Sequence, residues 1–250
     1  MVGDELLRHR CVGHSDLVAT TIVSSQLLQK LANQYGSDYR ETLTGFKWLA
    51  NAAIEKERSG GRFLFGFEEA LGYSVGPVVR DKDGISVALI LVDLVSQLKG
   101  SAQTLLDRLR EIYSTHGVHA SSQYSVTLPG ASGRAKIESM LSSLRDNPPE
   151  TVGGLTVIKR IDYQLGLTTQ DGQTQPLNGS MPPSNVLAFY LSDGTRILAR
   201  PSGTEPKIKF YFECVVPLAA EESLTIGEDK ANRQLNSVQQ AFLNAVGLSD

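Results

Sequence analysis

The stretch ARPSGTEPKIKFYFE (Ala199–Glu213) joins a short polar loop to the apolar alternation of a β-strand. Apolar and β-branched residues predict one strand before the loop, Arg196–Ala199, and another after it, Lys207–Val215. A further strand, Val186–Leu191, is joined to them by Ser192-Asp-Gly-Thr195, in which glycine favours a hairpin turn. This part of the chain therefore predicts antiparallel strands joined by short turns.

The rest of the carboxy-terminal half mixes strands and helices with no regular alternation between them. The segments expected there are a strand His119–Leu128, a helix Ala135–Leu144, a strand Leu155–Tyr163, a polar loop Leu165–Ser184 and a helix Glu228–Val246. The order indicates an α+β domain built on an antiparallel sheet.

The amino-terminal half instead alternates strands with helices, which is typical of an α/β domain with a largely parallel sheet and flanking helices. The predicted strands are Asp16–Val23, Asp38–Thr44 and Arg62–Gly66, and the predicted helices are Ser25–Tyr35, Phe46–Arg58, Ile85–Leu98 and Thr104–Thr115. Thr104 and Asp107 match a capping box. The pattern changes near residues 116–121, so we expect two domains, 1–118 and 119–250.

Composition narrows the class of protein. The 250 residues are 41% hydrophobic and 20% charged, as in a globular protein, and the net charge is −3. An acidic chain has no global field to attract nucleic acid or an anionic membrane, so an anionic ligand needs local positive charge. Met1–Arg10 is too polar for a signal peptide, and the apolar run Val87–Val92 is too short to span a bilayer. With two cysteines only, we expect a cytoplasmic protein.

The polar loop within the opening stretch carries the donors that a phosphate group needs. Arg200 offers a planar fork of N–H groups, Ser202 and Thr204 offer hydroxyls, and Gly203 and Thr204 can point backbone N–H groups inward. A charge-assisted hydrogen bond contributes about 1.5–3 kcal/mol, so several together can hold a phosphomonoester. The alternative is a β-turn that happens to contain an arginine.

Charged residues in the first half suggest a second group of contacts. Glu68 and Glu69 follow an apolar strand, so one of them can project into a cleft and accept two sugar hydroxyls; the alternative is two solvated acids. Lys47 lies beside Gly45 at a helix start, where a cation is disfavoured unless an anion binds; the alternative is an outward-facing lysine. Lys82 lies between two aspartates and can be their counterion.

Four segments resemble motifs of one family. Arg200-Pro-Ser-Gly-Thr-Glu-Pro-Lys207 resembles the phosphate-binding loop of the α-D-phosphohexomutase superfamily, which contains phosphoglucomutases and phosphomannomutases. Gly66-Phe-Glu-Glu-Ala-Leu-Gly-Tyr73 resembles its sugar-recognition loop, and Thr44–Trp48 and Arg80–Gly84 resemble two further cleft segments. The motifs occur in the family's order, and the resemblance runs from Gly3 to the carboxy terminus. It is closest to the branch with phosphopentomutase activity.

The resemblance implies binding roles for individual residues, and it assigns no residue of this chain as a nucleophile. By match, phosphate is bound by Arg200, Ser202, Gly203 and Thr204 with Lys207 alongside, sugar is bound by Glu68 and Glu69, and cationic contacts in the cleft come from Lys47 and Lys82. Many related loops carry serine where this chain has Ala70, so one hydroxyl contact is absent and the preferred sugar stays open.

Two parts of the family's machinery have no match in this sequence. The family's mutases have four domains, with a phosphoserine in the first and a magnesium loop of Asp-Gly-Asp-x-Asp-Arg type in the second. Asp81 and Asp83 belong to another motif, and they do not open a calcium loop, because its twelfth position is Val92 rather than glutamate. The resemblance therefore implies domains three and four, the latter with a fold similar to the TATA-box-binding protein.

The leading interpretation is the sugar-phosphate-binding half of an isomerase, with domains one and two as missing partners. Magnesium and glucose 1,6-bisphosphate are implied for the complete enzyme, this chain is expected to bind neither metal nor cofactor, and it is expected to be inactive alone. The alternative is a free-standing sugar-phosphate binding or regulatory module. A nucleic-acid-binding protein is disfavoured, because the sequence has no basic stripe with aromatic residues.

Overall fold

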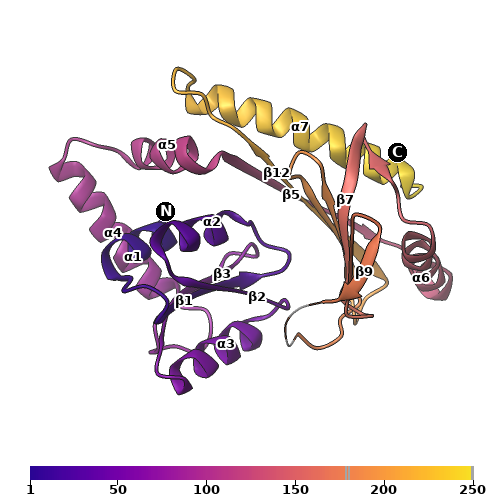
Figure 1. The fold of residues 1–250 in the computed structure, drawn as a ribbon, viewed down its shortest axis with the longest axis horizontal. Coiled ribbons are helices and arrows are strands. Elements are labelled where there is room, and N and C mark those ends of the chain that lie inside the picture. Colours follow the sequence, from indigo (N-terminus) through magenta and orange to yellow (C-terminus); the bar gives the residue numbers. More distant parts are fainter. Residues whose placement is uncertain (178, 180, 249–250) are drawn as a thin grey trace. The chain divides into compact units, whose positions relative to one another are not determined.

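The computed structural model describes residues 1–177, 179 and 181–248. The chain divides into two compact units, Met1–Gly117 and Val118–Asp250 (Figure 1). Each unit has its own sheet and its own core, and each is described by itself.

Unit 1 is built on a four-stranded sheet of order β2-β1-β3-β4. The central strand β1 runs parallel to both β2 and β3, and β4 is antiparallel to β3, which confirms the predicted α/β class with a largely parallel sheet. The strands are β1 Asp16–Thr21, β2 Asp38–Thr42, β3 Arg62–Glu68 and β4 Gly72–Val75. The helices are α1 Val2–Arg10, α2 Leu27–Tyr35, α3 Phe46–Arg58, α4 Gly84–Gly100 and α5 Leu105–His116.

Helices cover both faces of this sheet. Because side chains alternate along a strand, Val18 of β1 packs into a cluster with residues of α1 and α2, whereas Leu17 and Ala19 pack into a second cluster with α3. Figure 1 shows α1 and α2 on one side of the strands and α3 on the other. Burial on both faces explains why all six residues of β1 are buried.

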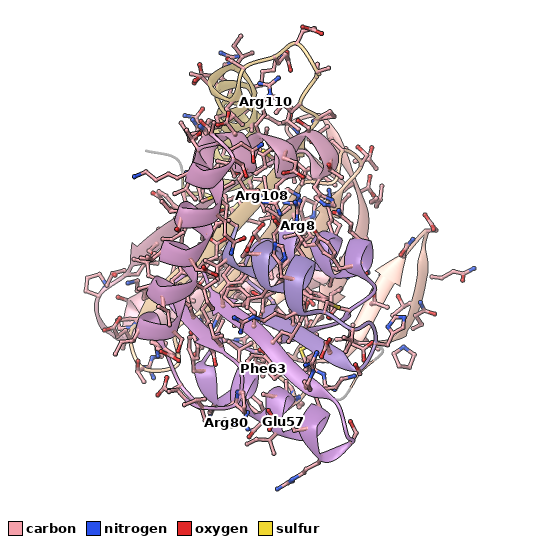
Figure 2. All side chains as sticks on the ribbon, turned by 90° about the vertical axis from the view of Figure 1, so that its left-hand side faces the viewer. Arg8, Glu57, Phe63, Arg80, Arg108 and Arg110 are labelled. Atoms are coloured by element: carbon pink, nitrogen blue, oxygen red, sulfur yellow. The ribbon has the colours of Figure 1, made fainter. Side chains whose placement is uncertain are left out.

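Helix α1 was not expected, because Met1–Arg10 is polar. Its acidic residue Asp4 is buried and forms an ion pair with Arg108 of α5, and the Tyr35 hydroxyl donates to the same carboxylate at 3.0 Å. The closely spaced charged residues Arg108, Arg110 and Glu111 predict a solvated helix face. That prediction is wrong for Arg108, whose side chain is 3% exposed. Figure 2 shows Arg8 and Arg108 near one another, and both donate to Glu111.

Asp16, the first residue of β1, links β1 to β3 through its side chain. Its carboxylate is fully buried and accepts two hydrogen bonds from Arg62, Nε at 2.7 Å and Nη2 at 2.9 Å, and one from the Val12 N–H at 2.6 Å. Asp16 and Arg62 are also register partners in β1 and β3. Burial alone raises the pKa of this carboxyl, but the hydrogen bonds from Arg62 and Val12 outweigh it and hold the pKa below its usual value.

Unit 2 contains an antiparallel sheet of order β5-β12-β11-β10-β7-β8-β9, with β6 paired to β7. This confirms the predicted α+β class. The strands are β5 Val118–Thr127, β6 Thr151–Val152, β7 Leu155–Asp162, β8 Leu167–Gln170, β9 Gln173–Pro176, β10 Leu187–Leu191, β11 Arg196–Pro201 and β12 Lys207–Val216. The helices are α6 Gly130–Asp146 and α7 Leu224–Ala245.

The core of unit 2 lies between the sheet and α7. The Phe242 ring of α7 lies 5.9 Å from Phe189, 5.7 Å from Phe210 and 6.0 Å from Phe212, centroid to centroid. All four rings are buried, and each contributes about 1.5–3 kcal/mol by leaving water. Figure 1 shows α7 lying along the sheet.

The predicted loop Leu165–Ser184 is wrong in part, because it contains the hairpin β8–β9. The two strands are rich in threonine and glutamine, and every residue of β9 is exposed. A polar edge strand has no apolar alternation, so nothing in the sequence separates it from a loop. Asn178 and Ser180 of the predicted loop lie outside the described residues.

Within the described part of the chain, no single helix has both the length and the hydropathy to cross a membrane. Helices α4 and α5, whose axes differ by 95°, have sufficient length and hydropathy only when the two are counted together.

The lowered pKa of Asp16 predicts an acid sensitivity of unit 1. A carboxyl whose folded-state pKa lies below its unfolded value of about 3.9 stabilises the protein above that pH, and the contribution is lost as the pH falls through the folded value. We expect Asp16→Asn to flatten the fall in unfolding free energy between about pH 5 and pH 2. Urea unfolding followed by fluorescence of Trp48, the single tryptophan, measures this in unit 1.

The matched control is Asp93→Asn, which removes an exposed carboxyl from α4 and should keep the pH profile of the parent. If the unfolding free energy of the Asp16 and Asp93 variants fell equally steeply with pH, the Asp16–Arg62 pair would not account for the loss of stability in acid.

Candidate functional site

The predicted sugar-binding residues of unit 1 lie where parallel strands end. Glu68 is the last residue of β3, and its Oε1 accepts a hydrogen bond of 2.5 Å from the N–H of Gly45, the N-cap residue of α3. Gly45 has φ 113°, a conformation that side chains other than glycine's rarely adopt. The carboxylate therefore lies at the positive end of the α3 dipole, which favours it.

Glu69 points to a different connection. Its Oε1 accepts from the Ser25 N–H at 3.2 Å, and its own N–H donates to the Ser24 hydroxyl at 3.2 Å, between β1 and α2. The two acidic residues thus reach toward α3 and α2 respectively, and both follow the carboxyl end of β3. In open α/β sheets, ligands bind at the carboxyl ends of the parallel strands.

The two predicted cations of unit 1 contact aromatic rings. Lys82 Nζ lies 4.5 Å from the Phe46 ring centroid and 3.4 Å from Asp81 Oδ1, so the counterion role foreseen for Lys82 is present alongside the ring contact. A Cβ on Gly72 would approach the same ring to 2.4 Å, so glycine is required for this packing. Lys47 is exposed on the first turn of α3, and its Nζ lies 5.2 Å from the Trp48 ring centroid.

The predicted phosphate loop is the turn between β11 and β12. The Ser202 N–H donates to the Lys207 carbonyl at 2.7 Å, and the Ser202 hydroxyl accepts from the Thr204 and Glu205 N–H groups at 3.4 and 3.2 Å. These bonds close the turn on itself. Gly203 and Thr204 are exposed at its tip, and Arg200 and Lys207 are half-buried at its base.

Neither cation of this turn forms an ion pair with a described residue. Among the described residues, no carboxylate lies within ion-pair distance of the Arg200 guanidinium or the Lys207 ammonium group. An arginine fork and an ammonium group beside two hydroxyls match the oxygens of a phosphomonoester. The turn therefore has the charge and the donors for an anion.

The described aspartates nearest one another in the sequence, Asp81 and Asp83, do not fit the magnesium ion that the family resemblance implies. Asp83 Oδ1 caps α4 by accepting from the Ser86 N–H at 2.9 Å, and its hydrogen bonds with Ser86 hold the pKa of Asp83 below its usual value. Asp81 Oδ1 is bonded to the Lys82 N–H at 2.7 Å. Within the described ranges, no three His, Cys, Asp or Glu side chains gather as a metal would require.

Sequence reasoning missed the partners of the two acidic residues. In the sequence, Ser24 fits the N-cap of the predicted helix Ser25–Tyr35, but α2 begins at Leu27 with Gln26 as its N-cap. Ser24 instead bonds the Thr21 hydroxyl at 2.8 Å and the Glu69 N–H. The signal was present in the run Thr20-Thr-Ile-Val-Ser-Ser25, where hydroxyl residues follow a buried strand.

Comparison with known proteins places this geometry in a family. Residues 1–113 match the phosphoglucomutase/phosphomannomutase alpha/beta/alpha domain III, and residues 159–225 match the C-terminal domain of the same family. The chain belongs to the phosphoglucomutase/phosphomannomutase family, of which it carries these two domains.

Curated relatives agree with this assignment. The chain is 38% identical over 211 residues to a phosphoglucomutase of Staphylococcus aureus strain MRSA252, an alignment that covers 84% of this chain and 37% of the relative. It is 41% identical over 202 residues to a probable phosphomannomutase of Haemophilus influenzae, covering 80% and 36%. The chain thus spans little more than a third of the length of these relatives.

Two solved structures share the fold. Parafusin from Paramecium, an exocytosis-sensitive phosphoprotein described as a phosphoglucomutase and crystallised in an open form, matches with a TM-score of 0.62 at 20% identity, over 95% of this chain and 40% of that one. A putative phosphomannomutase from Thermus thermophilus matches with a TM-score of 0.52 at 19% identity, over 94% and 40%.

The contact between Glu68 and α3 predicts a difference between the two acidic residues. Glu68→Ala removes a charge-assisted hydrogen bond from the Gly45 N–H and should lower the unfolding free energy of unit 1 by about 1–2 kcal/mol. Glu69 is exposed, so replacing it by alanine should lower the unfolding free energy by less than about 0.5 kcal/mol. Urea unfolding followed by Trp48 fluorescence compares them. Equal losses would contradict the assignment.

Proposed function

We propose that this chain is the sugar-phosphate-binding part of a phosphosugar mutase. The observation that supports the proposal most strongly is the pair of cations on the β11–β12 turn, Arg200 and Lys207, which have no carboxylate partner among the described residues. Family membership and the position of Glu68 at the carboxyl end of β3 support it further.

The β11–β12 turn holds a phosphate group in this proposal. Arg200 donates two N–H groups to phosphate oxygens, and Lys207 adds a second positive charge. The hydroxyls of Ser202 and Thr204 and the backbone at Gly203 complete the set of donors. Because the turn is already closed by the Ser202–Lys207 hydrogen bond, little ordering entropy is lost on binding.

The sugar contacts the carboxyl ends of the unit 1 strands. Glu68 and Glu69 accept hydrogen bonds from sugar hydroxyls, and Lys47 and Lys82 contribute positive charge beside them. Glu68 accepts from the Gly45 N–H through Oε1, and no described residue bonds to its other carboxylate oxygen. With Ala70 in place of the serine common in related loops, the contact set leaves glucose, mannose and ribose phosphates as candidates.

Catalysis in the complete mutase is shared between two halves. Domains that this chain does not contain supply a phosphoserine and the magnesium ion, and a sugar bisphosphate intermediate turns over so that either phosphate faces the serine. The present chain binds the phosphate group that is not reacting and orients the sugar. Such binding away from the reacting atoms lowers the entropic part of the barrier.

The phosphate role predicts the effect of Arg200→Ala. Loss of a charge-assisted contact should weaken binding of glucose 1-phosphate by about 1.5–3 kcal/mol, measured by isothermal titration calorimetry. The control is Arg134→Ala, which removes an exposed arginine from α6 and should bind like the parent. Superimposable titration curves for the two variants would show that Arg200 of the β11–β12 turn does not bind the phosphate group.

The division of labour predicts that the chain alone does not catalyse. With glucose 1-phosphate, magnesium and glucose 1,6-bisphosphate, we expect no glucose 6-phosphate above background in a coupled dehydrogenase assay. The reason is that phosphoryl transfer requires a positioned donor and charge neutralisation at the transferring group. Turnover that increases with protein concentration would show that the chain carries its own chemistry.

A further inference from the structure

A row of side chains crosses four strands on the helix-covered face of the unit 2 sheet. Phe189 of β10 is the register partner of Arg160 of β7, Arg160 that of Thr169 of β8, and Thr169 that of Thr174 of β9. Directly opposed residues in antiparallel strands point to the same face. Phe189 packs on Phe242 of α7, so Arg160 and the two threonines also lie on the face that α7 covers.

This row borders a hollow of about 220 Å³. Leu144 and Arg145, near the end of α6, form one wall, and Leu167 of β8 and Phe189 of β10 add apolar surface. Figure 1 shows β7 and β9 on the side of the sheet near α6. The hollow lies wholly within unit 2, and the residues of the β11–β12 turn are not part of its lining.

Most of the charged side chains that line the hollow already have hydrogen-bond or ion-pair partners, or are exposed to water. Arg145 donates Nε to Asp162 Oδ2 at 2.8 Å and Nη2 to Asn185 Oδ1 at 2.5 Å. The other oxygen of Asp162 accepts from the N–H groups of Gln164 and Leu165 at 2.9 and 3.2 Å. Asp146 also lines the hollow, but its side chain is exposed, so water screens its charge.

Arg160 is different. It is half-buried, it lines the hollow, and among the described residues its guanidinium has neither an ion-pair nor a hydrogen-bond partner. Beside it in the row, the hydroxyls of Thr169 and Thr174 are 2.9 Å apart. One hydroxyl hydrogen is used in that bond, and the other remains to donate to a ligand.

The size and lining of the hollow restrict the ligand. The volume of about 220 Å³ lies below the roughly 300–1,000 Å³ of pockets that take drug-sized ligands, so it favours a small molecule. The planar fork of an arginine matches a carboxylate in a bidentate contact. Leucine and phenylalanine walls favour an apolar body behind that head group.

We propose that this hollow binds a small organic acid, with its carboxylate on Arg160 and the free hydroxyl of the Thr169–Thr174 pair, and its apolar body against Leu144, Leu167 and Phe189. The site is independent of the sugar-phosphate role, because no residue of that role lines it.

The test uses benzoate as the probe, with binding to the full chain measured by saturation-transfer-difference NMR. We expect saturable binding that weakens at least tenfold in Arg160→Gln and persists in Lys159→Gln. Lys159 is the matched control, because it directly precedes Arg160 in β7 and points to the opposite face of the sheet. Its Nζ lies 5.1 Å from the Tyr190 ring centroid. Thr169→Val is the second variant, with an expected loss of several-fold.

Neutral benzyl alcohol, which has a similar body, should bind at least tenfold more weakly than benzoate. The proposal is overturned if benzoate does not saturate, if benzyl alcohol binds equally well, or if Arg160→Gln and Thr169→Val both bind like the parent. It is also overturned if benzoate binding is lost in Arg200→Ala, because the acid would then occupy the β11–β12 turn. Failure of glucose 1-phosphate to bind would leave this result unaffected.

Discussion

Two positive charges on one short turn, neither of them in an ion pair with a described residue, are the constraint on which the functional interpretation depends. Surface arginines and lysines are usually solvated or paired, and each alone would indicate nothing. Here the turn is closed by its own backbone and hydroxyl bonds, so Arg200 and Lys207 are held at the base of a preformed loop. A preformed cationic loop binds an anion at low entropic cost.

Unit 1 has two acidic side chains at the carboxyl end of its parallel strands. The β3 strand ends in Glu68, whose carboxylate accepts a hydrogen bond from the N–H of Gly45, the N-cap of α3. Glu69 reaches the connection after β1. The helix dipole that disfavours Lys47 is thereby offset by an internal carboxylate. Arg80 lies beside Glu57 of α3 (Figure 2) and is bonded to it, so it is not among the cations available to a ligand.

Local signals explain what the sequence could predict. The helix Phe46–Arg58 and the capping box at Thr104 and Asp107 were foreseen from short-range patterns, and the structure confirms both. Helix α1 and the burial of Arg108 were not foreseen, because they depend on an ion pair between Asp4 and Arg108, residues 104 positions apart. The β8–β9 hairpin was missed because both of its strands are polar. The roles of Arg200, Ser202, Glu68 and the other site residues remain predictions.

The most direct measurement of the central claim is a crystal structure of the chain soaked with glucose 1-phosphate. The account predicts phosphate density at the β11–β12 turn, with oxygens within hydrogen-bond distance of the Arg200 guanidinium and of the Ser202 or Thr204 hydroxyl. Well-ordered ligand bound elsewhere, with the turn closed on itself and no phosphate at Arg200, would contradict it.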